Sequence, residues 1–367
     1  MKTPYTLFGW HLSYFSGKVM CYLRYKQIPF EYRQVNMFTL LHKIKKHTGA
    51  VVMPVLVNPE GDWLQDSSVI MDVLEQQFPA LPVVPATPVQ RFAASLMEAW
   101  GDEWWVPVAM HTRWSYPENY SLFEREAGAA LLPHFPAWLQ RRAVGYVAAT
   151  LRSYLPDVGV RSEQFTLMEQ STLAMLDLLE AHFAVQPFLF GDHPTTGDFG
   201  LVGSMYAHLG RDPWPAREWI APRPHLHAWI ERMAQPQPPV AATLLPQDQI
   251  AATLNPVFAV IFHEFVPMLA AINSQLKSLL KDWPAGKILP RRLDEIEFPM
   301  GQGRFKRKAL PYTLWMVQRT LDCYAVMTSE EQQQVRHWLQ PLGGEALLNL
   351  TIPRLERCGL RVKVVHA

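Results

Sequence analysis

A serine-containing segment near the start of the chain has the residue types of an anion site. The run LSYFSGKV at 12–19 stands where a strand pattern ends and a helical pattern begins. A helix N-terminus offers unpaired N–H groups and the positive end of the helix dipole, which favour an anion such as a thiolate. The hydroxyl of Ser13 could donate a hydrogen bond to a sulfur bound there. Equally, Ser13 or Ser16 could do no more than cap the helix.

Two further segments offer backbone and charged groups to a ligand. Met53-Pro54 precedes a strand pattern. Proline cannot donate to a β-ladder, so it belongs at a strand start or in a cis turn, where the Met53 backbone would be open to a ligand. Asp66 and Ser67 begin a helical pattern, where the Ser67 N–H and hydroxyl could hold a carboxylate and Asp66 an ammonium group. The alternatives are an ordinary strand-initiating proline and a simple helix cap.

The elements around these segments predict a small α/β domain. Strands are expected at 5–8, 30–35, 54–57 and 63–65, and helices at 16–25, 39–47 and 67–78. The order strand-helix-strand-helix-strand-strand-helix fits a mixed sheet with helices on both faces. Proline at every third position of 79–88 predicts a polyproline II linker to a second domain.

The rest of the chain is predicted to be largely helical. The clearest helices of the second domain are expected at 91–105, 163–184 and 198–209, and those of the last segment near 250–282, 310–326 and 329–341. A proline cluster at 236, 238 and 239 separates the two, and a basic loop is expected at 304–308. The predicted domains are 1–80, 89–235 and a C-terminal extension, 246–367.

Together these features resemble the glutathione transferases, whose N-terminal domain has a thioredoxin-like fold. Met53-Pro54 and Asp66-Ser67 stand at the family's glutathione-binding positions, and Ser13 at the position of the catalytic serine in serine-type members. SGKV at 16–19, continued by LRYKQIPF at 23–30, is similar to the family's first helix and second strand. Met53 replaces the usual valine, and Val52 stands where the family often has a polar residue that contacts glutathione.

The resemblance extends into the second domain, which it implies is all-helical. FLFG at 188–191 followed by TTGD at 195–198 is similar to the family's capping box, which is a folding element. The resemblance covers roughly residues 3–235. Long bacterial members of the family also carry a C-terminal extension.

The resemblance implies that Ser13 activates the thiol of glutathione for attack on an electrophilic, largely apolar cosubstrate. Glutathione would then be bound by Ser13, Met53, Pro54, Asp66 and Ser67. If Ser13 is not the catalytic residue, Tyr14 and Tyr5 are the next candidates. No metal is expected.

An aromatic-rich stretch in the second domain predicts the cosubstrate pocket, because flat apolar ligands favour such walls. The residues expected to line the pocket are Tyr14, Trp100, Trp104, His111, Trp114 and Tyr206. The alternative is that the tryptophans fill a core.

Composition narrows the partners and the compartment. Lys and Arg total 34 against 33 Asp and Glu, which gives no electrostatic case for nucleic acid. The apolar stretch 255–272 is broken by His263, Glu264 and Pro267, so it predicts a buried helix and no membrane span. Three cysteines without a CxxC pair fit a reducing compartment, and the first residues show no secretory signal. A cytoplasmic protein is therefore expected, with a homodimer implied by the resemblance alone.

Two other functions remain open from the sequence. The chain could be a non-catalytic binding or assembly module with the same fold. It could also be a glutathione-dependent thiol reductase, although such enzymes carry a cysteine where this chain has Ser13.

Overall fold

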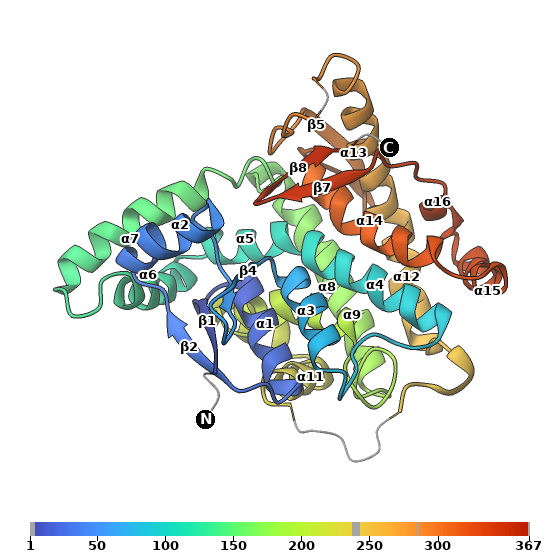
Figure 1. The fold of residues 1–367 in the computed structure, drawn as a ribbon, viewed down its shortest axis with the longest axis horizontal. Coiled ribbons are helices and arrows are strands. Elements are labelled where there is room, and N and C mark those ends of the chain that lie inside the picture. The colour runs from blue at the N-terminus through green and yellow to red at the C-terminus, as the bar shows by residue number, and fades with distance from the viewer. Residues whose placement is uncertain (1–3, 237–242, 285, 366–367) are drawn as a thin grey trace. The chain divides into compact units, whose positions relative to one another are not determined.

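The computed structural model describes residues 4–236, 243–284 and 286–365. The chain forms two compact units, each discontinuous in sequence. Unit 1 comprises Met1–Val83, Ala109–Tyr154 and Leu201–Val240, and unit 2 comprises Val84–Val108, Leu155–Gly200 and Ala241–Ala367. The elements of both are labelled in Figure 1, and each unit is described by itself.

Unit 1 is built on a four-stranded mixed sheet. Its strands are β1 (Tyr5–Gly9), β2 (Phe30–Gln34), β3 (Val55–Val57) and β4 (Trp63–Gln65), in the order β2-β1-β3-β4. β1 is parallel to β2 and antiparallel to β3, and β3 is antiparallel to β4. The helices between and after them are α1 (Tyr14–Tyr25), η1 (Thr39–Ile44), α2 (Lys45–Thr48) and α3 (Ser67–Gln77). The predicted order of elements is confirmed.

Helices α1 and α3 contact each other and share an apolar core with the sheet. Val19 and Leu23 of α1 are fully buried, as are Ile70 and Leu74 of α3 and Leu7 of β1. The spacing of four within each helix places both side chains on one face. Burying each such side chain contributes about 1.5–3 kcal/mol, which is why this face determines how the helices dock.

The proline-rich segment after α3 does not form the polyproline II linker predicted from its spacing. Leu81 has a φ of 54°, outside the polyproline II region. Its carbonyl accepts a hydrogen bond from Lys26 Nζ at 3.2 Å, and the Val83 N–H donates to Glu75 at 3.2 Å. Lys26 and Glu75 form an ion pair of 2.7 Å. Polar contacts with α1 and α3 therefore override the local preference of proline.

The remainder of unit 1 is helical. Its helices are α5 (Val106–Ser115) from Ala109 onward, α6 (Pro117–Leu131), α7 (Ala137–Arg152), η3 (Met205–Leu209), α10 (Pro213–Pro215), η4 (Ala216–Ile220) and α11 (Pro224–Ala234). α6 and α7 form an antiparallel pair, and η3 contacts both α1 and α11.

Unit 2 combines three earlier helices with the C-terminal extension. The earlier helices are α4 (Pro88–Glu103), α8 (Phe165–Phe183) and, as far as Gly200, α9 (Thr196–Ser204), with the short η2 (Ser162–Gln164) before α8. The extension contains η5 (Pro246–Asp248), η6 (Ala252–Leu254), α12 (Asn255–Val260), η7 (Ile261–Phe265), α13 (Val266–Leu279), α14 (Pro311–Ala325), α15 (Ser329–Leu339), η8 (Gln340–Leu342) and α16 (Glu345–Leu348). Two hairpins complete it, β5 (Glu295–Met300) with β6 (Gly303–Lys308) and β7 (Leu355–Cys358) with β8 (Arg361–Val364).

The extension and α4 share one core. α14 and α15 both pack on α4. Phe92 of α4 meets the rings of Tyr324 and Trp338 edge-on, with centroids 6.0 and 6.4 Å away. Ser95 and Thr320 join their hydroxyls at 2.9 Å within the same contact. The extension is therefore an integral part of unit 2.

Asp248, at the start of the extension, also caps α4. The side chain of Thr87 does not cap this helix. Instead, the Asp248 carboxylate accepts from the Val89 N–H at 2.7 Å and the Gln90 N–H at 2.8 Å. A carboxylate at a helix N-terminus satisfies unpaired donors and complements the helix dipole.

The predicted Thr-x-x-Asp element lies at the start of α9. Asp198 is fully buried and accepts from the Thr195 N–H at 2.9 Å and the Thr195 hydroxyl at 3.0 Å. Its other oxygen accepts from the Leu189 N–H at 3.0 Å. One carboxylate thus fixes both the first turn of the helix and the loop before it.

The apolar stretch predicted as a buried helix lies in the core of unit 2. Among the described residues, the run Pro246–Leu279 is long and apolar enough, by length and composition, to cross a membrane. However, 61% of its most apolar window is buried in the structure. Phe258, Phe265 and Ile272 are fully buried. The prediction of a buried helix is confirmed.

The strands of the extension were not predicted, and the predicted basic loop is wrong. Residues 304–308 belong to strand β6, with Phe305 and Arg307 facing inward and Arg304 and Lys306 outward. The alternation of buried and exposed residues is the period of a half-buried strand. Because Arg307 is one of the buried residues, the basic run conceals this alternation in the sequence.

The turn of this first hairpin is held by Glu264 of η7. The Gly301 N–H donates to the Glu264 carboxylate at 2.6 Å, and Gly301 has a φ of 51°. Burial raises the pKa of Glu264 to about 7, although this hydrogen bond opposes the shift. Because the fold disfavours the ionised form of Glu264, its protonated form contributes its whole stabilisation below the pKa of Glu264 in the unfolded chain. That contribution is lost as the pH rises towards 7.

We therefore predict that Glu264→Gln changes the pH dependence of stability. The amide oxygen of the variant would still accept from Gly301, but the amide cannot ionise. Both proteins should be equally stable below pH ~4.5, and the variant should gain on the wild type up to pH ~7, by on the order of 3 kcal/mol. Urea unfolding at pH 4.5 and pH 8 measures this. Glu60→Gln, at an exposed turn, is the control. An equal difference at both pH values would contradict the prediction.

Candidate functional site

Three segments of unit 1 meet at one edge of its sheet. Phe8 pairs with Val55, and Val55 pairs with Gln65, so the three residues form one row across the sheet. β1 ends at Gly9, β3 begins at Val55 and β4 ends at Gln65. The turn before α1, the Met53-Pro54 peptide and the start of α3 must therefore all lie at this edge.

Ser13 is the N-cap of α1. Its backbone is extended, with φ −89° and ψ 125°, and its hydroxyl accepts from the Ser16 N–H at a long 3.4 Å. The side chain is half-buried. The first turn of α1 contains no acidic residue, so no side-chain charge of that turn neutralises the positive end of the helix dipole. The Ser13 hydroxyl and the N-terminus of α1 thus lie together just after the end of β1.

The hydroxyl of Ser16, one turn further, lies in a different environment. It is 1% exposed and has no hydrogen-bond partner among the described residues. A Cβ added to Gly9 would come within 2.6 Å of it, so this hydroxyl points at the strand beneath the helix. Of the two serines that the sequence offered as helix caps, Ser13 is the observed N-cap, and it is also the one with the more accessible side chain.

Met53-Pro54 lies at the start of β3, as predicted. The peptide bond is cis, which was one of the two predicted conformations. Pro54 is buried and Met53 is half-buried.

Asp66 and Ser67 begin α3, as predicted. Asp66 is the N-cap, with a φ of 85°, and one of its oxygens accepts from the Ser68 and Val69 N–H groups at 3.1 Å each. Ser67 is 5% exposed. The capping role is thus real, and it does not exclude a ligand role for the same carboxylate, because a carboxylate has further acceptor positions.

Lys18 is a charged residue of this region to which sequence reasoning gave no role. It is fully buried, and its Nζ donates to the Ser68 hydroxyl at 3.0 Å. A buried ammonium group therefore lies behind the start of α3. The available signal was a lysine beside Val19 and Met20 within an apolar helical pattern.

The two tyrosines that are alternatives to Ser13 as the catalytic residue lie in different places. Tyr5 is the first residue of β1, and its hydroxyl donates to Gln77 at 2.9 Å. Each strand residue advances the chain by about 3.3 Å, so Tyr5 lies at the opposite edge from the three segments. Tyr14 follows Ser13 directly, is 7% exposed and packs against Phe15 at 4.7 Å between ring centroids.

Four of the predicted pocket residues belong to unit 1: Tyr14, His111, Trp114 and Tyr206. His111 is 1% exposed and bonds the Ser115 hydroxyl at 2.9 Å. Trp114 is 9% exposed and meets Phe123 edge-on at 4.8 Å, with Arg152 over its ring at 5.3 Å. Tyr206 lies against Gly17 of α1 and lines an open surface cavity of about 660 Å³ with Arg211 and Glu231.

The other two, Trp100 and Trp104, belong to unit 2. Trp100 is 1% exposed and meets Trp105 edge-on at 5.5 Å. Trp104 packs against Phe265 and Phe298 of the extension, at 6.2 and 5.8 Å between ring centroids. Both tryptophans fill a core, as the alternative reading of the sequence held, and their role as pocket residues stays a prediction.

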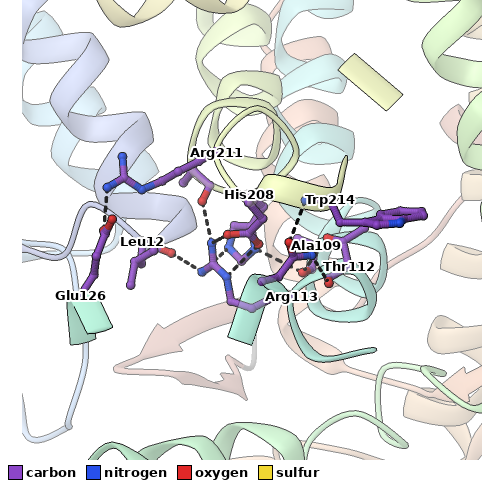
Figure 2. A network of polar contacts seen from close by, with 11 residues as sticks. Leu12, Ala109, Thr112, Arg113, Glu126, His208, Arg211 and Trp214 are labelled. Atoms are coloured by element: carbon purple, nitrogen blue, oxygen red, sulfur yellow. Dashed lines mark hydrogen bonds and ion pairs between the residues drawn. The ribbon is translucent and has the colours of Figure 1, made fainter. Parts of the chain in front are cut away.

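A buried arginine joins the turn before Ser13 to the helices of unit 1 (Figure 2). Arg113 of α5 is 3% exposed, and its Nε and Nη2 bind the two oxygens of Asp212 at 3.0 and 2.8 Å. Its Nη1 donates to the Leu12 carbonyl at 2.5 Å, and its Nη2 also donates to the Ala207 carbonyl at 2.7 Å. The sequence placed Arg113 in the aromatic stretch and gave no hint of this role.

His208 completes this network as a neutral side chain. Burial, with a further contribution from Arg113, holds its pKa well below the usual value. Its Nδ1 lies 3.2 Å from the Ala109 carbonyl, which can only accept, so Nδ1 carries the proton. Nε2 is then free to accept from Arg113 Nη1 at 3.4 Å. The 4.0 Å separation of His208 and Asp212 is therefore no ion pair.

The chain matches two models of one protein family. Residues 7–82 match the glutathione S-transferase N-terminal domain, and residues 136–232 match the glutathione S-transferase C-terminal domain. The two models occur in the order found in that family, and this chain belongs to the glutathione S-transferase family. None of the curated protein sequences matches this one.

Three of the similar solved structures show the extent of the likeness. A glutathione S-transferase from Methylobacterium radiotolerans JCM 2831 in complex with glutathione sulfonate has 23% identity over 67% of this chain and 99% of its own, with a TM-score of 0.40. A glutathione S-transferase from Methylobacillus flagellatus KT with GSH bound has 18% identity over 64% of this chain and 100% of its own, with a TM-score of 0.38. FzlA from C. crescentus has 16% identity over 68% and 97%, with a TM-score of 0.40.

Asp66 offers a test that separates capping from ligand binding. Asp66→Asn keeps an oxygen acceptor for the two N–H groups, and asparagine tolerates a positive φ. Asp66→Ala loses both, at about 1 kcal/mol or more of stability. If the charge holds an ammonium group of the ligand, both variants should bind glutathione at least tenfold more weakly, while only the alanine variant loses stability. Calorimetry and thermal unfolding measure the two effects. Unchanged affinity in Asp66→Asn would leave Asp66 as a cap only.

Proposed function

We propose that this protein is a glutathione transferase that activates the thiol of glutathione for attack on an electrophilic, largely apolar cosubstrate. The observation that carries the proposal is the row Phe8, Val55 and Gln65, which brings Ser13, Met53 and Asp66-Ser67 to one sheet edge. Membership of the family supports the proposal, since both of its domain models match the chain.

The proposed ligand fits the groups at this edge. Glutathione carries an ammonium group, carboxylates, peptide groups and a thiol. Asp66 offers an anion to the ammonium group, and the α3 N-terminus with Ser67 offers donors to the neighbouring carboxylate. The Met53 backbone offers a peptide group beside β3. Ser13 and the α1 N-terminus remain for the sulfur.

The energetics of thiol activation match this arrangement. A free thiol has a pKa of about 8.5, so only a few per cent is thiolate at neutral pH. Lowering that pKa by about two units takes roughly 2.7 kcal/mol. One charge-assisted hydrogen bond contributes about 1.5–3 kcal/mol, so the Ser13 hydroxyl and the helix terminus suffice. The thiol proton leaves to solvent, the sulfur forms a bond to the electrophilic carbon, and the leaving group departs with its electron pair.

The proposed cosubstrate site comprises the predicted residues of unit 1, Tyr14, His111, Trp114 and Tyr206. We also propose a cytoplasmic location, which is supported by the three free cysteines, Cys21, Cys323 and Cys358. The homodimer stays a prediction from the family resemblance.

Ser13→Ala should keep glutathione binding and lose most turnover with a chloro-nitroaromatic substrate. Without the hydroxyl the thiol pKa should rise from about 6.5 towards about 8.5, and at pH 6.5 a rise of two units lowers the thiolate fraction from about a half to about 1%. We expect at least a tenfold loss of kcat at that pH, with the glutathione KM within about threefold. Steady-state kinetics and the ultraviolet absorbance of the bound thiolate measure this.

Ser16→Ala is the matched control, because it removes a hydroxyl from the same helical turn that has no partner among the described residues. It should keep full activity. Equal activity of wild type and Ser13→Ala would exclude Ser13 as the activating residue and leave Tyr14 as the next candidate. If calorimetry shows no glutathione binding at millimolar concentration, the chain is instead a binding or assembly module.

A further inference from the structure

Both hydrogen-bonding groups of the peptide unit that enters Ser13 are fixed by partners. The Leu12 carbonyl accepts from Arg113 Nη1 at 2.5 Å, and the Ser13 N–H donates to the Trp10 carbonyl at 2.9 Å. Because the peptide unit is planar, bonds at both ends fix its orientation. The orientation of this peptide unit determines the position of the Ser13 Cα, from which the side chain extends.

The turn between β1 and α1 is also held by a hydrogen bond on its sheet side. The Trp10 indole N–H donates to the Val35 carbonyl, just after β2, at 2.7 Å. Leu12 itself is 3% exposed and Trp10 is 7% exposed. Thus the turn has one anchor on the sheet side and one anchor, Arg113, on the helical side. Only the second comes from outside the α/β part of unit 1.

The chemistry of the anchor is specific to arginine. Arg113 binds Asp212 with two nitrogens, and the same planar group reaches the Leu12 and Ala207 carbonyls (Figure 2). Asp212 is fully buried and neutralises the guanidinium, so Arg113 adds little net field at Ser13. A lysine could pair with Asp212, but its single ammonium group cannot span the four acceptor atoms in one plane. The effect on Ser13 is therefore geometric.

From this geometry we propose that Arg113 is a positioning residue for thiol activation: it holds the Leu12–Ser13 peptide so that the Ser13 hydroxyl meets the glutathione sulfur. The inference rests on the proposed function, since it assumes that Ser13 acts on the thiol. It assigns a task to a buried side chain of α5 that acts through the Leu12–Ser13 peptide. Misplacement of a hydrogen-bonding group by about 1 Å weakens a bond that depends steeply on distance and angle.

The test variant is Arg113→Lys, which keeps the charge opposite Asp212. It should raise the pKa of the thiol in the glutathione complex by about one unit, from about 6.5 to about 7.5, so that kcat/KM at pH 6.5 falls roughly fivefold. At pH values above the raised pKa, activity should return towards that of the wild type. The glutathione Kd should stay within about twofold. The pH profile and the thiolate absorbance of the binary complex report this directly.

Arg223→Lys is the matched control. Arg223 is also buried, at 8% exposed, and its Nη1 donates to the Trp219 carbonyl at 2.6 Å. Its replacement should lower thermal stability to a similar degree without moving the thiol pKa. A loss of stability in Arg113→Lys with an unchanged thiol pKa would overturn the proposal, as would an activity loss equal at every pH.

Ser13→Ala, measured alongside, separates this inference from the proposed function. If Ser13→Ala leaves the thiol pKa unchanged, the proposed function fails. If Ser13→Ala raises the pKa and Arg113→Lys does not, only the positioning role fails. In the double variant the two shifts should be less than additive, because both act through one hydroxyl. If Arg113→Lys does not fold, Asp212→Glu keeps the charge of the pair but displaces the same guanidinium, so it should raise the thiol pKa in the same direction; no rise there overturns the role.

Discussion

The register of three short strands is the constraint on which the candidate site depends. Phe8, Val55 and Gln65 stand in one hydrogen-bonded row, and each lies at or next to the end of its strand. Because side chains alternate between faces with a period of two, a slip of one residue in β3 would exchange Val55 and Leu56 between the two packed faces of the sheet. Val55 and Leu56 are fully buried, one on each face of the sheet, so burial holds the register in place. The site follows from this row and from the two helices that leave it.

Each of the two units contains a buried arginine, and the two arginines are held in different ways. In unit 1, Arg113 meets Asp212 and two carbonyls, and removing one partner of such a buried pair typically costs about 3–5 kcal/mol. In unit 2, Arg307 of β6 is also buried, but its Nε has no partner among the described residues, and burial lowers its pKa to about 10. The first charge is held by directed hydrogen bonds, whereas the second is held mainly by the apolar packing of its hairpin.

The C-terminal extension supplies a cap and packing partners to a helix of the second domain. α4 is capped by Asp248 and packed by α14 and α15, so part of the helical domain depends on residues far along the chain. Trp104, whose pocket role stays a prediction, packs its ring against Phe265 and Phe298 of the extension. Aromatic residues favour both ligand walls and cores, and only the partner that covers them distinguishes the two.

The sequence by itself determined the order and approximate bounds of the elements in the first domain. Local signals sufficed there, because apolar periodicity, turn residues and caps are properties of neighbouring residues: Ser13, Pro54 and Asp66 each mark the start of an element. Only the tertiary structure decided that Arg113 reaches Leu12, that Asp248 caps α4 and that Arg307 of β6 is buried against Met268. These contacts join residues distant in sequence, so their energies leave no local pattern. A buried arginine or a capping aspartate reads as an ordinary surface charge until the chain that covers it is in place.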